Sequence, residues 1–104
     1  MLAGGTTNAN EIVDAARVID GARLDASARS LLAVDVLQSA LDGISAGTIS
    51  EQPSAQVFGR PLTENGLRRG LEGAYRDLAR VTSEPAERIR LVDAANALRV
   101  RSLV

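Results

Sequence analysis

The chain has 104 residues, a length that suits one compact domain rather than two. Its formal charge is −1, from 12 basic and 13 acidic residues, so no large field of one sign would draw it to nucleic acid or to an anionic membrane. Cysteine and histidine are both missing and every basic residue is arginine, which removes disulfides, thiolate metal sites and lysine chemistry from the possible functions.

The N-terminal part predicts a flexible leader followed by a helix. Residues 1–8 are rich in Gly, Thr and Asn and lack hydrophobic periodicity, which is typical of a frayed segment. Asn8, with Glu11 in the first turn that follows, fits a capping box at a helix start. Apolar residues then recur at helical spacing, and this predicts a helix over residues 9–20.

A second helix and a long connection are predicted next. Asp25 offers an N-cap, and apolar residues at spacings of three and four predict a helix over residues 26–42. The two helices form an antiparallel pair over residues 9–42. Residues 45–62 contain two prolines and no helical period, and no run of alternating apolar residues indicates a strand, so this segment is predicted to be a loop.

Another helical pair is predicted over residues 64–99. Thr63 is placed to cap its first helix, and Pro85 falls in the first turn of its second. Three glycines share one side of the helix after Thr63, although each costs about 1 kcal/mol relative to alanine. We expect a neighbouring helix or loop to approach them closely. These glycines are Gly66, Gly70 and Gly73.

The last helix carries the acid most expected to be buried. Its predicted inward face consists of Ile89, Val92, Ala95 and Leu98. Asp93 and Asn96 stand one turn apart, and we expect them to hydrogen-bond the backbone of a neighbouring segment. A structural role is favoured over catalysis for Asp93, because general acid–base work needs two carboxylates in one cleft and the acids of this chain are scattered.

Together these elements predict an all-α fold of about four helices in two antiparallel pairs, forming a single repeat-type domain over residues 9–104. Helical repeats are built from such pairs, and a pair needs stacked neighbours to bury its apolar face. We therefore expect a tetratricopeptide-like helical repeat or its C-terminal cap.

Four arginines of the third predicted helix are a candidate partner surface. Their guanidinium groups could bind an acidic partner or a phosphorylated peptide. The alternative, a solvated face with local ion pairs, is favoured because Glu64, Glu72 and Asp77 interrupt the row. Aromatic side chains for stacking on nucleic acid are missing from this row as well. The four are Arg68, Arg69, Arg76 and Arg80.

The segment PLTENGLRRGLEGAYRDLAR at residues 61–80, followed by ERIRLVDAANALRVRSLV from Glu87, resembles the tetratricopeptide-type region of actinobacterial serine/threonine kinases of the protein kinase G type. The resemblance covers the second helical pair well and the first only loosely. The matching positions are Pro61, Leu62, Thr63, Gly66, Leu67, Tyr75, Leu78, Ala79, Leu91, Val92, Asp93, Ala95, Asn96 and Arg99. Structural roles are expected for Thr63, Tyr75, Asp93, Asn96 and Arg99.

In that family a rubredoxin-like metal site and a kinase domain precede a repeat region that assists dimerisation and substrate selection. The resemblance implies that this chain is the C-terminal repeat segment of a multidomain kinase, and the missing cysteines are compatible with the cytoplasmic location that we expect. It would act without catalysis, by self-association as a homo-oligomer or by substrate docking. A free-standing helical regulator or a small enzyme that uses acids and arginine alone is the alternative.

Kinase catalysis by the chain itself is not expected. The reaction needs a strand lysine for the phosphates and a metal-binding aspartate before Phe-Gly. The chain has no lysine, and Phe58-Gly59 follows Val57 instead of an aspartate. We therefore expect no catalytic residues, no cofactor and no metal, and a protein partner rather than nucleic acid, a membrane or a small-molecule substrate.

Overall fold

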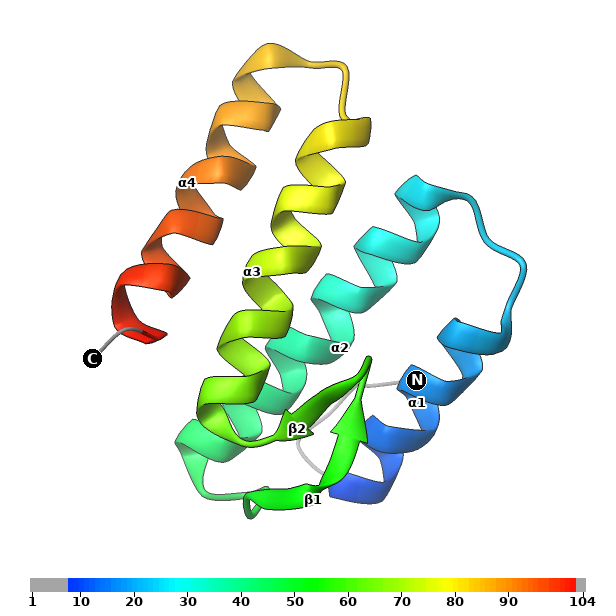
Figure 1. The fold of residues 1–104 in the computed structure, drawn as a ribbon, viewed down its shortest axis with the longest axis vertical. Helices are drawn as coiled ribbons and strands as arrows, with labels where there is room; N and C mark the ends of the chain where they lie inside the picture. The colour runs from blue at the N-terminus through cyan, green and yellow to red at the C-terminus, as the bar shows by residue number, and fades with distance from the viewer. Residues whose placement is uncertain (1–7, 103–104) are drawn as a thin grey trace.

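The computed structural model describes residues 8–102, so the leader predicted at residues 1–8 lies outside the described residues except for Asn8. Four helices and a hairpin follow one another as α1 (Ala9–Gly21), α2 (Ala26–Ala46), β1 (Gln52–Val57), β2 (Arg60–Leu62), α3 (Glu64–Val81) and α4 (Pro85–Ser102). Successive helices run in opposite directions, and α3 lies between α2 and α4 (Figure 1). The fold is mostly helical, as predicted, with a small two-stranded sheet added.

The first three helices begin at the caps that the sequence predicts. Asn8 and Glu11 form a capping box, in which the Glu11 amide donates to Asn8 Oδ1 at 3.0 Å and the Asn8 amide donates to Glu11 Oε1 at 3.1 Å. Asp25 accepts a hydrogen bond from an amide in the first turn of α2 at 2.7 Å, and Thr63 does the same for α3 at 3.0 Å. Each cap satisfies an amide that has no partner within its helix, which stabilises a helix by about 1 kcal/mol.

The second helix is longer than the predicted range of residues 26–42, and Gly43 lies inside it. A Cβ at Gly43 would lie 2.5 Å from Ile49 Cδ1, so the missing side chain makes room for the chain to fold back against α2. The Ile49 amide donates to the Gly43 carbonyl at 3.1 Å and fixes this return. α2 ends at Ala46 and is capped by Gly47, whose φ of +81° lies in the left-handed region that glycine adopts without strain.

The prediction that residues 45–62 form a loop without strands is wrong. Strands β1 and β2 pair in an antiparallel hairpin, with Phe58 and Gly59 at its turn at φ of 52° and 77°. In these strands only Val57 and Leu62 are buried, so the sequence lacks the apolar alternation by which a half-buried strand is recognised. The hairpin is held instead by two anchor residues and a turn.

The main core forms where α1, α2, α3 and the hairpin meet. Its largest fully buried side chains are Ile12, Leu37, Val57, Leu62, Leu67 and Leu71. A smaller cluster of Leu78, Ala79 and Leu91 joins α3 to α4. Tyr75 packs against both clusters, which makes α3 the helix that connects the two halves of the domain.

The inward face predicted for α4 is partly wrong. Leu91 and Ala95 are buried, but Ile89 is 63% exposed and Val92 is 37% exposed. The reason is that α4 packs mainly against α3, and one neighbour covers only a narrow stripe of a helix. Across residues 8–102, no helix is both long enough and apolar enough to span a bilayer.

Candidate protein-binding groove

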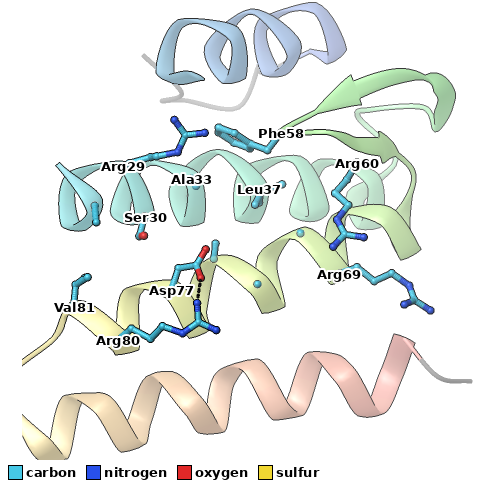
Figure 2. A pocket seen from close by; sticks show the side chains of 14 residues that line it. Arg29, Ser30, Ala33, Leu37, Phe58, Arg60, Arg69, Asp77, Arg80 and Val81 are labelled. Atoms are coloured by element: carbon cyan, nitrogen blue, oxygen red, sulfur yellow. Dashed lines mark hydrogen bonds and ion pairs between the residues drawn. The ribbon is translucent and has the colours of Figure 1, made fainter. Parts of the chain in front are cut away.

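A groove of about 490 Å³ lies between α2 and α3 and reaches the turn of the hairpin at Phe58. Its floor consists of small and apolar residues: Ala33, Leu37, Gly70, Gly73 and Ala74. Its rim carries four arginines from three elements, shown in Figure 2: Arg29 of α2, Arg60 of β2, and Arg69 and Arg80 of α3. Asp77 is the one acidic residue among the lining side chains, so the groove is positively charged within a chain that is nearly neutral.

Two of these arginines are already paired and two are not. Arg80 Nη1 lies 2.8 Å from Asp77 Oδ1, and Arg29 Nη2 lies 2.5 Å from Asp20 Oδ1. Among the residues that the structure describes, Arg60 and Arg69 have no ion pair. Both side chains lie at the same end of the groove (Figure 2), where an added anion would displace no ion pair of the described residues.

The glycines of α3 differ in what they approach. A Cβ at Gly66 would collide with the Pro61 carbonyl oxygen, and a Cβ at Gly70 would lie 3.3 Å from Arg60 Cγ. The hairpin therefore makes the close approach that the sequence predicts at these two positions. At Gly73 the prediction is wrong, because a Cβ there would meet nothing within 4 Å and would project into open space on the groove floor.

The four arginines of the predicted partner surface do not lie on one ridge. Arg69 and Arg80 line the groove on the side of α2. Arg76 lies on the side of α4, where its guanidinium donates to Glu72 Oε2 and, at 2.9 Å, to Asn96 Oδ1. Arg68 is half-buried and pairs with Glu64 at 3.1 Å. Arg68 and Arg76 therefore form local ion pairs, and only Arg69 and Arg80 lie in the groove.

The positions with expected structural roles, Thr63, Tyr75, Asp93, Asn96 and Arg99, lie outside the groove lining. Thr63 caps α3, and Tyr75 lies half-buried between the two apolar clusters. Asp93 is exposed, so the expectation that it is buried is wrong, and Asn96 accepts from the Arg76 side chain rather than from a backbone amide. Arg99 is exposed as well.

Sequence reasoning missed Arg29 and Arg60. They lie far from α3 in the sequence, and Arg60 reaches the groove only because the hairpin folds its aliphatic stem against Gly70. Gly73 was the one available signal, because its missing side chain leaves open space on the floor of the groove.

The groove has the chemistry of a binding surface for anions. Guanidinium groups on its rim can donate paired hydrogen bonds to carboxylates, and its apolar floor can bury small side chains. Within residues 8–102, no group of three or more His, Cys, Asp or Glu side chains is arranged to hold a metal ion.

Comparison with known proteins gives a consistent assignment. The family described as "Protein kinase G tetratricopeptide repeat" matches residues 3–102. The "Serine/threonine-protein kinase PknG" of Mycolicibacterium smegmatis is 38% identical over 106 residues, which cover 98% of this chain and 13% of that protein. The protein of the same name from Mycobacterium leprae is 36% identical over 108 residues, again 98% of this chain and 13% of the relative.

The chain thus spans about an eighth of the length of these curated relatives, and the matched part is a repeat region. The helical pairs that stack through α2 and α3 agree with that architecture. This chain belongs to the protein kinase G tetratricopeptide repeat family.

Proposed function

We propose that this chain is the non-catalytic interaction domain of a serine/threonine protein kinase, acting by self-association or by docking of protein substrates. The family match over nearly the whole chain carries this proposal. A position at the C-terminal end of the kinase, a cytoplasmic location and an actinobacterial source belong to the same proposal, and the mycobacterial origin of the similar kinases supports the last of these.

The surface of the domain supports an interaction role. Large apolar side chains protrude from all four helices; among them Val18 of α1, Leu31 of α2 and Ile89 of α4 are 70%, 55% and 63% exposed. In a helical repeat such side chains are normally covered by a neighbouring repeat or a partner. The charged groove between α2 and α3 adds a second kind of surface, suited to recognition of a particular sequence.

The coding region around these 104 residues tests the link to a kinase. We expect a kinase domain encoded upstream in the same reading frame. An independent start codon directly before this segment, with no kinase domain attached, would favour the free-standing regulator or small enzyme instead.

Two measurements test the interaction role. Sedimentation equilibrium of the chain should show a mass that rises with concentration, and deletion of the segment from the parent kinase should weaken phosphorylation of a protein substrate more than that of a short peptide. A chain that stays monomeric at high concentration, together with a deleted kinase whose assembly and substrate selection are unchanged, would refute the proposal.

A further inference from the structure

We propose that the groove between α2 and α3 binds an extended acidic segment of a partner protein. Carboxylates of the segment would pair with the arginines at the two ends of the groove, and small apolar side chains between them would rest on the floor. This inference rests on one part of the proposed function, the docking of protein substrates, and adds the chemistry of the partner segment.

The charges on the rim indicate a ligand with negative charge. The lining residues include four arginines and one aspartate, although the chain as a whole carries a formal charge of −1. Arg60 and Arg69 have no carboxylate partner among the residues described, whereas the other arginines of α3 are all paired. A ligand carboxylate could thus bind this end of the groove without displacing an ion pair of the domain.

Gly73 indicates that main chain comes close to the floor. Packing within the domain gives no reason for a glycine here, since a Cβ would meet nothing within 4 Å. A glycine inside a helix nevertheless costs about 1 kcal/mol relative to alanine. An extended segment lying against α3 at Gly73 would need the space that a side chain would fill, just as β2 needs the space at Gly70.

The separation of the arginines favours several carboxylates over a single phosphate. Arg69 and Arg80 stand eleven residues apart on α3, a rise of about 16 Å along the helix axis. Arg60 and Arg69 at one end could converge on a single phosphate, but Arg80 lies at the opposite end of the groove (Figure 2), so only a ligand with a second anionic group would engage both ends. About five residues of extended chain cover that distance, so acids at both ends of a short apolar stretch would match the rim.

The test uses a fluorescein-labelled peptide, Asp-Glu-Ala-Val-Ala-Glu-Asp, titrated with the full chain and followed by fluorescence anisotropy. We expect saturable binding that weakens with salt and disappears when every acid of the peptide is replaced by its amide. Arg69→Glu should weaken binding about tenfold by reversing a rim charge. Gly73→Leu should weaken it by a similar factor by filling the floor without any change in charge.

Arg88→Glu is the matched control, since Arg88 is exposed on α4, outside the groove, and has no ion pair in the described part of the chain. It changes the net charge as Arg69→Glu does and should leave the affinity unchanged. Circular dichroism of each variant verifies the fold, and Gly73→Val replaces Gly73→Leu if the leucine variant fails to fold.

Four results would overturn the inference. They are equal weakening by Arg88→Glu and Arg69→Glu, unchanged affinity in a folded Gly73 variant, tighter binding of a phosphoserine peptide that lacks carboxylates, and no saturable binding at all. If the chain self-associates but does not bind the peptide, the proposed function is retained and only the acidic ligand of the groove is refuted. If the chain is monomeric and the kinase that lacks this segment still selects its substrates, both the proposed function and this inference are wrong.

Discussion

Gly66 and Gly73 occupy one side of α3 but have opposite surroundings, which makes them a matched pair for substitution. Gly66→Ala should lower the free energy of unfolding by about 1–3 kcal/mol, because the new Cβ would collide with the Pro61 carbonyl oxygen and displace the hairpin. Gly73→Ala should raise it by about 0.5–1 kcal/mol, because the methyl group enters open space and alanine favours the helix. Urea unfolding followed by circular dichroism measures both changes. Destabilisation of equal size in the two variants would show that both glycines serve internal packing.

Glu87 shows how a local contact acts on a single titrating group. A side-chain hydrogen bond from Arg90 lowers the pKa of the Glu87 carboxyl, and the charge of Arg90 acts in the same direction. Because the folded-state pKa is lowered, the stabilising contribution is present above the unfolded-state pKa and is lost as the pH falls through the folded-state value. Arg90→Gln should raise the carboxyl pKa toward its ordinary value in an NMR titration, and Arg88→Gln should not. An unchanged pKa in Arg90→Gln would mean that the two side chains do not pair in solution.

At the scale of elements, Thr63 determines where α3 begins and joins it to the hairpin. Its hydroxyl accepts from the Gly66 amide, so Thr63→Ala should lower the free energy of unfolding by about 1 kcal/mol. Thr63→Ser keeps the acceptor and should retain most of the stability. Urea unfolding of the two variants makes the comparison. If serine destabilises as much as alanine, the methyl group of Thr63 matters and the cap does not.

Elements with local signals could be predicted, and elements that depend on distant contacts could not. The caps at Asn8, Asp25 and Thr63 lie next to the helices they start, so the sequence indicates these helices directly. The hairpin depends on Val57 and Leu62 reaching a core made by other elements, and neither strand alternates. The groove was not predicted for the same reason: of its arginines the sequence singled out only Arg69 and Arg80, as members of a row on one helix, because the other two come from α2 and the hairpin.

At the scale of the whole molecule, α4 packs mainly against one helix, α3, and its uncovered side indicates where a second copy would pack. α4 is covered by α3 on one side, and its outer side presents Ile89 and Val92 one turn apart. Burial of such a pair against another copy would remove apolar surface from water, which the isolated domain cannot do. The outer side of α4 is therefore the surface through which we expect the chain to self-associate.

The double variant Ile89→Glu, Val92→Glu should reduce the mass of the chain at high concentration to that of the monomer, because two charges would have to be buried in the contact. Its free energy of unfolding should change by no more than about 0.5 kcal/mol, since both side chains are exposed and glutamate is a good helix former. Sedimentation equilibrium measures the mass, and urea unfolding measures the stability.

Val18→Glu on α1 is the control, because Val18 is at least as exposed as Ile89 and lies on a helix at the other side of the domain (Figure 1). Loss of association in Val18→Glu but not in the α4 variant would move the interface to α1, because only a contact that includes the substituted side chain is disrupted by its charge.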